Sequence, residues 1–393
     1  MTPKQVQRAK AVILAIVFLD MVGFTMLIPD VQFRAKSLGA DGWVLGALMS
    51  SMFASQTVFS PIWSSLSDRV GRRNIFLLCT GFSCVAMLLY AFADHLSLMF
   101  VCRILAGIGA ANVAVGNALL TNLVSDEERD RAISHFSAAM TAGLLCGPAV
   151  GGLMPSLIGR QGLGLLAGGL CLAGIIAGFM VLAKDKPEVV TQRKRNPFGI
   201  VLFREVPQLR VLAITAMVAW FALALLEGTF GLLIQHTLGL DEKHFGFLFS
   251  YEALVALGCQ TWLLMWLRKR LSYRAFLQLC FLFQGAGLVL MPFAPSLVVL
   301  VVASTLFALG NAMSTPIVNM AASDLVPKAR HGELFGLFQG SRGFGFLVAP
   351  AVGTQLFSLD PSYPYIAAGL VCLAGVIALS FSVSSAPAST SAD

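Results

Sequence analysis

Five ionisable side chains stand inside long apolar stretches of the sequence, and these residues are the best placed to do chemistry. Asp20 interrupts VILAIVFLDMVGFTMLI, and the other four are Arg103, Glu227, Glu252 and Arg342. A charge is costly in an apolar interior, so a charged residue kept there commonly carries protons or holds a charged solute. The sequence contains no phosphate-binding loop, no metal-ligand cluster and no nucleophile with a base. We therefore expect neither a catalysed reaction nor a cofactor.

The composition indicates that most of the surface does not face water. Of the 393 residues 57% are hydrophobic and 12% are charged, and the mean hydropathy is +0.80. A soluble chain carries about 25% charged residues. Stretches such as GLGLLAGGLCLAGIIAGFMVL are long enough to cross a hydrocarbon core of about 30 Å as helices, whereas membrane-spanning strands would alternate in polarity. The composition therefore predicts an all-α membrane protein.

Twelve such stretches predict twelve transmembrane helices. The first is too long for a signal peptide and lacks a small-residue cleavage site, so we interpret it as a retained helix. The expected spans are 11–33, 43–64, 75–93, 96–122, 132–158, 162–183, 211–236, 245–267, 275–293, 296–321, 333–357 and 363–384.

The distribution of Lys and Arg predicts the orientation, because these residues resist translocation across the membrane. With both termini in the cytoplasm, 21 of the 27 basic residues lie on the cytoplasmic side. The four expected on the opposite side are Arg34, Lys36, Arg160 and Lys243. The net charge of +7 is therefore a sign of topology, with membrane lipids as partners and no binding of nucleic acid.

The two halves of the chain repeat each other. GLLCGPAVGG from Gly143 matches GFLVAPAVGT from Gly345, and LGADGWVLGAL from Leu38 matches LGLDEKHFGFL from Leu238. A duplicated six-helix unit predicts two pseudo-symmetric bundles with a solute site between them. We assign residues 1–183 to the first bundle, 184–210 to a cytoplasmic linker, and 211–393 to the second bundle with a short disordered tail.

Four stretches resemble signatures of the major facilitator superfamily, and in particular of its twelve-helix drug:proton antiporters, which include tetracycline exporters. They are LDMVGFTMLIPDV (19–31), SSLSDRVGRRNIFL (64–77), LMFVCRILAGIGAA (98–111) and GLLCGPAVGG (143–152). The sequence departs from the loop signature at Ser64, where the family has Gly, and the equivalent of Asp68 in the second half is Arg270. The resemblance covers nearly the whole chain, and it implies the major facilitator fold and transport by alternating access.

The second of these stretches is a loop whose charged residues can form a gate. Gly71 permits a tight turn, and the Asp68 carboxylate can accept hydrogen bonds from an Arg or from a facing helix N-terminus. The resemblance implies that the loop latches the two bundles in the outward-open state. The expected gating residues are Asp68, Arg69, Gly71, Arg72 and Arg73.

The fourth stretch and its repeat place small residues on one helix face. Glycines four residues apart let a neighbouring backbone approach closely, and a proline permits a bend. We expect these faces to meet between the two bundles. The packing set is Gly143, Gly147, Pro148, Gly151, Gly152, Gly345, Pro350 and Gly353.

Asp20 is expected to be the leading proton carrier and to interact with Arg103. Counted from the helix ends at 1.5 Å per residue, their Cα levels differ by about 6 Å, which an Arg side chain can span. The proton affinity of a buried carboxyl depends on whether an Arg lies beside it, so separating the pair would change proton binding. A permanent structural ion pair is the alternative.

In the second half, Glu227 is expected to carry a proton or to bind a cation. Glu252 could do the same or point to lipid headgroups, and Arg342 could hold an anionic group or neutralise an acid. The residues expected to line the solute cavity are Phe24, Asn112, Phe230, Gln235, Glu252, Asn311, Phe338, Gln339 and Arg342.

Together these features favour a proton-coupled exporter of a small amphipathic or lipophilic compound, of the drug-efflux type. We expect a monomer in the plasma (inner) membrane. One alternative is a transporter of a single metabolite, either a symporter or a facilitator, for which Arg342 would suit an anionic substrate. A non-transporting membrane receptor on the same fold is the alternative of another class.

Overall fold

The computed structural model of the chain describes residues 2–125, 128–183, 200–327 and 330–382. Every regular element within these ranges is a helix. Most of the expected linker, residues 184–199, and the expected tail, residues 383–393, lie outside the described residues.

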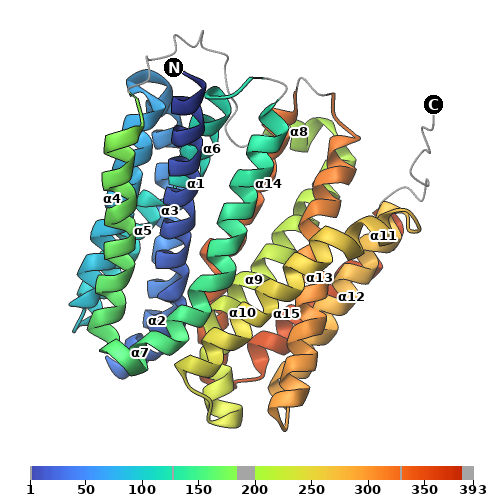
Figure 1. Cartoon of the computed structure of the whole chain (residues 1–393). Coiled ribbons are helices and arrows are strands. Elements are labelled where there is room, and N and C mark those ends of the chain that lie inside the picture. Colours follow the sequence, from blue (N-terminus) through green and yellow to red (C-terminus); the bar gives the residue numbers. More distant parts are fainter. Residues whose placement is uncertain (1, 126–127, 184–199, 328–329, 383–393) are drawn as a thin grey trace. The chain divides into compact units, whose positions relative to one another are not determined.

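The helices are labelled in Figure 1. Those before the linker are α1 (Pro3–Met26), α2 (Ile28–Ser37), α3 (Gly42–Val70), α4 (Arg72–Ala91), α5 (Leu96–Gly109), α6 (Asn112–Asn122) and α7 (Arg129–Val181). Those after it are α8 (Ile200–Glu205), α9 (Pro207–Leu238), α10 (Glu242–Gly258), the π-helical η2 (Cys259–Leu263), α11 (Leu264–Arg268), α12 (Tyr273–Leu290), the 3-10 turn η3 (Met291–Phe293), α13 (Leu297–Ser323), α14 (His331–Leu359) and α15 (Tyr363–Ser382).

The described residues account for twelve membrane-length helices. Nine segments are long and apolar enough to cross a membrane. One of the nine, Arg131–Val181, contains two helices, because Gly159 breaks α7 with φ 71° and ψ 170°. The remaining two helices are α3 and α14, each of 29 residues. The expected all-α, twelve-helix membrane fold is therefore confirmed.

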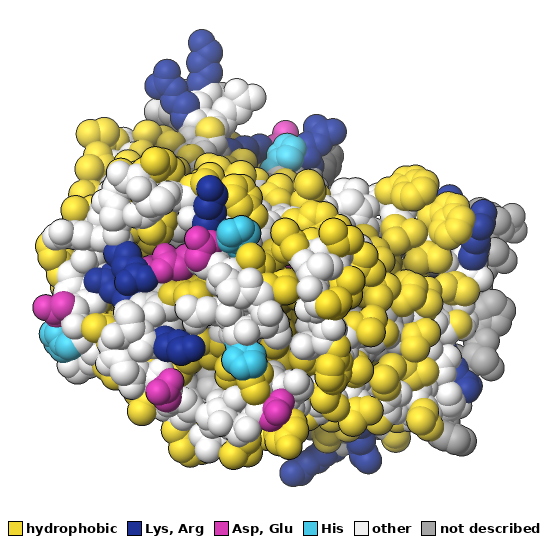
Figure 2. All heavy atoms as spheres, turned by 90° about the horizontal axis from the view of Figure 1, so that it is seen from below, with side chains coloured by type: hydrophobic (Ala, Val, Ile, Leu, Met, Phe, Trp, Pro, Cys, Tyr) yellow, Lys and Arg dark blue, Asp and Glu magenta, His cyan; other side chains and the backbone are white. Residues whose placement is uncertain are grey.

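The surface of the molecule agrees with a membrane environment. Hydrophobic side chains cover much of the face seen in Figure 2, and charged side chains gather over part of it. Large apolar side chains on the helices are exposed, for example Leu157, Met180 and Trp262. A soluble monomer rarely exposes so much contiguous apolar surface, whereas lipid tails cover it without cost.

Local sequence signals explain where several helices begin, bend and end. Thr2 caps α1 through a reciprocal pair of hydrogen bonds with Gln5. The chain bends at Leu27, between α1 and α2, where Pro29 lacks the backbone N–H that a continuous helix would need. Gly239 ends α9 in the left-handed conformation, with φ 65°, which glycine adopts without steric strain.

The described residues group into two units. The first contains the residues up to 183, except for Asp41–Gly46, together with Asp241–Ser250. The second contains Asp41–Gly46 and the other described residues from Ile200 onwards. Asp41–Gly46 and Asp241–Ser250 thus each group with the unit built mainly from the other half of the chain, and we call them the exchanged segments. They form the beginnings of α3 and α10, which are equivalent in the sequence repeat.

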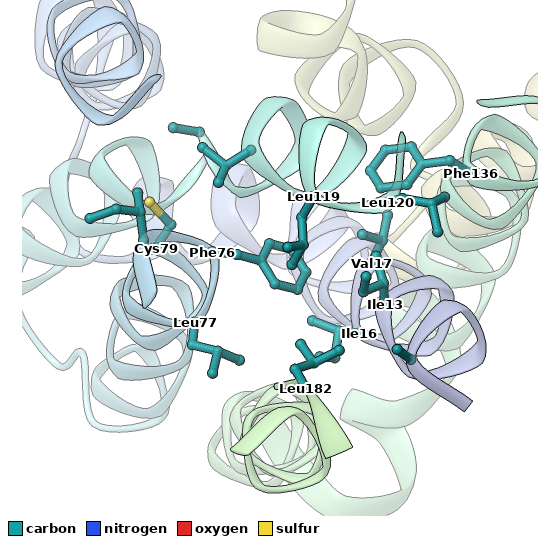
Figure 3. Packing of buried hydrophobic residues seen from close by; sticks show 14 of the residues in the cluster. Ile13, Ile16, Val17, Phe76, Leu77, Cys79, Leu119, Leu120, Phe136 and Leu182 are labelled. Carbon is teal, nitrogen blue, oxygen red and sulfur yellow. The ribbon is translucent and has the colours of Figure 1, made fainter. Parts of the chain in front are cut away.

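A compact apolar cluster holds α1, α4, α6 and α7 together in the first unit. Phe76 lies in its centre, next to Leu119 and facing Ile13 (Figure 3). Leu182, just after α7, closes the cluster on the side of Ile16. Because lipid tails are as apolar as these side chains, the cluster stabilises the unit through close packing more than through removal from water.

The glycine face of α7 packs against α1 inside the first unit. A Cβ on Gly143 would lie 2.5 Å from the Cβ of Met21, and a Cβ on Gly151 would overlap the carbonyl oxygen of Met26. In the second unit, Gly345 packs in the same way against Phe221 of α9. The expectation that this face meets the other bundle is therefore wrong for Gly143, Gly151 and Gly345. Their spacing requires a close neighbour but does not say which helix that neighbour is.

The residues beside this face contact the exchanged segments. A Cβ on Gly246 of α10 would lie 2.9 Å from the Cα of Gly152 and would overlap the carbonyl oxygen of Pro148. In the second unit, a Cβ on Gly46 of α3 would lie 3.1 Å from the carbonyl oxygen of Pro350. Gly46 and Gly246 are equivalent in the repeat, so the two copies use the same contact.

We expect Gly151→Ala to lower the free energy of unfolding by about 1–3 kcal/mol, the usual cost of overpacking. The added methyl group would overlap backbone on α1, which cannot move as a flexible side chain can. Gly169→Ala in the same helix is the control, because a Cβ there meets nothing within 4 Å. Thermal unfolding of the purified protein, followed by loss of the monodisperse peak, measures both. Equal melting temperatures for the two variants would contradict the packing described.

Candidate functional site

Asp20 lies on α1 and is enclosed by α4, α6 and α7 of the first unit. The residue is only 3% exposed. Its Oδ2 accepts a hydrogen bond of 2.6 Å from Nδ2 of Asn112 on α6. Its Oδ1 accepts a weaker bond of 3.5 Å from the Cys171 thiol on α7, and the Ser83 hydroxyl on α4 also interacts with it. The structure therefore places this carboxyl in the interior of the unit, as the sequence predicts.

The partner of Asp20 differs from the one expected. Arg103 is buried on α5, but its Nη2 donates to the carbonyl oxygen of Met49 on α3, 3.2 Å away. Asn112 takes the expected place of the Arg, and it opens α6 directly after the break between α5 and α6. Residue positions along two helices can be counted from the sequence, but the rotation of each helix about its axis cannot. Arg103 was therefore expected beside Asp20 although its side chain points elsewhere.

Every hydrogen-bond partner of Asp20 described here is a neutral group. A thiol is a weak donor, so Asn112 supplies the one strong bond. Cys171 divides its contacts between Asp20 and the carbonyl oxygen of Thr80, 3.4 Å away. The protonation of Asp20 is consequently governed by burial and neutral hydrogen bonds rather than by an ion pair.

A second buried carboxyl, Glu252, lies inside the second unit. The residue is 8% exposed on α10, and its Oε1 has no hydrogen-bond partner among the described residues. Polar neighbours are the hydroxyl groups of Ser304 on α13 and Tyr365 on α15. The Tyr365 hydroxyl accepts a bond of 2.9 Å from Thr229. Glu252 therefore does not point to lipid headgroups, which was one of the two expected positions.

Glu227 links this buried carboxyl to a basic side chain. It is half-buried on α9, and its charge acts on both Glu252 and Arg342. Arg342 is exposed on α14, and its guanidinium lies 4.3 Å from the ring centre of Trp220 and 5.5 Å from that of Phe346. Glu227 thus stands between the charge of Arg342 and the second carboxyl, Glu252.

The other residues expected to line a cavity fall into three groups. Phe230 and Phe338 are buried and contribute to packing. Asn311 accepts a hydrogen bond of 3.4 Å from Gln284, and Asn112 binds Asp20 as described above. Gln235 and Gln339 are exposed, and Phe24 is half-buried.

The loop between α3 and α4 is fastened to the first unit by its arginines. Arg72 pairs with Asp68 at 3.3 Å and donates to the carbonyl oxygen of Ala118 on α6. Arg73 donates to the carbonyl oxygen of Phe179 on α7 at 3.3 Å. Gly71 has φ 104°, a value that other residues rarely adopt, so the glycine of this signature is required by the turn. Arg69 is exposed.

A charged cluster around Asp30 was not predicted from the sequence. This carboxyl is fully buried on α2, accepts a hydrogen bond of 2.6 Å from the Tyr90 hydroxyl, and lies 3.0 Å from Nε of Arg160. Arg34 lies 4.0 Å from it and packs over the Tyr90 ring. Arg160 also pairs with Glu242. Arg34 and Arg160 are two of the four basic residues expected from the sequence to lie opposite the cytoplasm, which was the available signal.

Comparison with known proteins places these residues in a family. The model of the Major Facilitator Superfamily matches residues 13–262 and 212–393. Multidrug resistance protein 2 of Bacillus subtilis (strain 168) is 26% identical over 378 residues, covering 93% of this chain and 92% of its own length. Quinolone resistance protein NorA of Staphylococcus aureus is 22% identical over 363 residues, covering 92% and 93%.

Solved structures share the fold. The nucleoside transporter NupG superposes with a TM-score of 0.73 at 14% identity, covering 95% of this chain and 97% of its own. The human organic anion transporter MFSD10 gives a TM-score of 0.68 at 18% identity, covering 96% and 100%. The expected family is therefore confirmed, and its relatives include drug-resistance proteins. This integral, multi-pass membrane protein belongs to the Major Facilitator Superfamily.

Proposed function

We propose that the protein is a proton-coupled exporter of small amphipathic or lipophilic compounds that works by alternating access. The observation that carries the proposal is the buried carboxyl of Asp20, held by neutral donors on α6 and α7. A titratable group kept in a membrane-spanning interior is costly unless it has a function. The names of the relatives, multidrug and quinolone resistance proteins, support a drug as the transported compound.

In this proposal Asp20 is the principal proton carrier and Glu227 the second. Arg103 acts as a positioning residue, because its bond to the Met49 carbonyl joins α5 to α3. The substrate is bound by exposed polar groups such as Gln339 and Arg342 and by the aromatic ring of Trp220.

The arrangement in the cell follows from the charge distribution. We propose that residues 1–183 and 211–393 form two bundles joined by a cytoplasmic linker at 184–210. Both termini would lie in the cytoplasm, with the protein a monomer in the plasma (inner) membrane. The loop with Asp68 and the three arginines that follow it would then be the cytoplasmic gate.

Proton release on substrate binding tests the proposal. Adding a lipophilic cation such as ethidium to the purified protein in weakly buffered detergent should release protons, because substrate and proton compete in an antiporter. The release should be saturable, and Asp20→Asn should remove most of it. An absence of release with ethidium and with a panel of neutral lipophilic drugs would contradict proton-coupled export.

A transporter for one anionic metabolite is the second candidate. It is favoured by Arg342, an exposed residue whose guanidinium packs on the Trp220 ring and would serve as a preformed binding surface for an anion. Vesicles with an imposed pH gradient distinguish the two, since an exporter moves solute against the proton flow and a symporter moves it with the flow.

A further inference from the structure

An apolar groove of about 650 Å³ lies on the first unit, apart from the Asp20 site. It is formed by one face of α4 with parts of α5 and α7. Its lining includes Leu78, Gly81, Phe82, Val85, Leu105 and Phe179. Several of these side chains are exposed, Phe179 to 62%, so the groove opens to the outside of the protein. In a membrane, the medium there is lipid.

The length of the groove suits a lipid acyl chain. From Asn74 to Val85 the lining follows α4 for about 16 Å at 1.5 Å per residue. One leaflet fills about half of a 30 Å hydrocarbon core, or about 15 Å. Asn74 stands at one end of this length, and the side chains beyond it are apolar.

That same end of the groove is positively charged. The Arg73 guanidinium lies 5.5 Å from the ring centre of Phe179 and donates to the Phe179 carbonyl oxygen. Arg69 is exposed and precedes Val70, which lines the groove. Asp68 is already paired with Arg72 at 3.3 Å. Arg73 is only 6% exposed, so it supplies positive charge beneath this end of the groove, whereas the exposed Arg69 can contact a ligand directly. An apolar groove with such a basic end fits a ligand with a long apolar chain and an anionic head.

We propose that this groove binds an anionic phospholipid, with one acyl chain along α4 and the phosphate at Arg69, close to the buried charge of Arg73. The lipid would belong to the cytoplasmic leaflet, and only this choice of leaflet rests on the proposed topology. A lipid with a zwitterionic head would keep the chain contacts but would bring no net charge to the two arginines.

Native mass spectrometry of the purified protein tests the binding directly. In mixed micelles with equal amounts of phosphatidylglycerol and phosphatidylcholine of the same chain length, the protein should retain phosphatidylglycerol about fivefold or more in excess. This is the factor expected from roughly one basic residue at an anionic lipid surface. Equal retention of the two lipids would overturn the proposal.

Two variants then locate the bound lipid. Gly81→Leu should remove most of the retained lipid, because a Cβ at Gly81 meets nothing within 4 Å and the longer side chain would fill the groove. The matched control is Gly169→Leu on α7, where a Cβ also meets nothing and which does not line the groove. Equal lipid retention in both variants would place the lipid elsewhere and overturn the proposal.

A third variant separates the head from the chain. Arg69→Gln should lower the preference for phosphatidylglycerol several-fold while chain binding persists, and an unchanged preference would contradict the placing of the phosphate at Arg69. The wild-type measurement needs no transport, so it stands whether or not the protein proves to be an exporter.

Discussion

Asp20→Asn is expected to abolish proton-driven transport while leaving the protein folded. The substitution keeps the size of the side chain and its strong bond, because the amide oxygen can accept from Asn112. The NH2 group then faces the Cys171 thiol, whose weaker bond to Asp20 is replaced by its contact with the Thr80 carbonyl oxygen. What the substitution removes is the group that binds and releases a proton. In vesicles with an imposed pH gradient, accumulation of ethidium should fall to the level of vesicles without protein, at an unchanged melting temperature.

The matched control for this result is Asp94→Asn. It makes the same chemical change at an exposed carboxyl outside the membrane-spanning helices, and transport should stay close to wild type. If Asp20→Asn transports as well as Asp94→Asn, Asp20 is not the proton carrier. If the phenotype that the protein confers on the cell also survives both Asp20→Asn and Glu227→Gln, a receptor on the same fold becomes the better explanation.

Glu227→Gln is expected to produce the second large loss. Glu227 is half-buried, and its charge acts on both the guanidinium of Arg342 and the carboxyl of Glu252. Its removal leaves Glu252 as the one carboxyl of the group, and Glu252 is buried. We expect ethidium-induced proton release to drop at least to about half, and transport to drop further, because both exchange sites are needed in one cycle.

Charge and proton exchange at this position can be separated by further variants. Glu227→Asp keeps a titratable carboxyl and should retain part of the transport. Glu227→Gln combined with Arg342→Gln restores neutrality but should not restore transport. Glu205→Gln is the control, since Glu205 is an exposed acid paired with Arg330. Recovery of transport in the double variant would show that Glu227 only neutralises Arg342.

Several features of the site could be inferred from residue type alone. A carboxyl in the middle of an apolar helix has to be enclosed by protein, and Asp20 and Glu252 both are. The glycine of the loop signature predicts a turn that only glycine adopts easily, and Gly71 has φ 104°. Such inferences succeed because the cost of exposing a charge to lipid, or of a strained backbone, is a property of the residue itself.

Other features depended on which surfaces meet in space. The glycines of α7 had to face a close neighbour, but the neighbour is α1 of the same unit. Asp20 had to have a partner, but the partner is Asn112 rather than Arg103. The cluster of Asp30 with Arg34, Tyr90 and Arg160 joins residues from α2, α4 and α7 that no spacing in the sequence connects.

The sequence by itself determined the membrane environment, the twelve helices, the internal repeat and the burial of Asp20, Arg103 and Glu252. Each of these follows from hydrophobicity summed along a segment, or from comparison of one segment with another. Only the tertiary structure decided the partners of the buried groups and the presence of the groove beside Arg73. Those depend on the rotation and packing of each helix against its neighbours, which are set by many weak contacts at once.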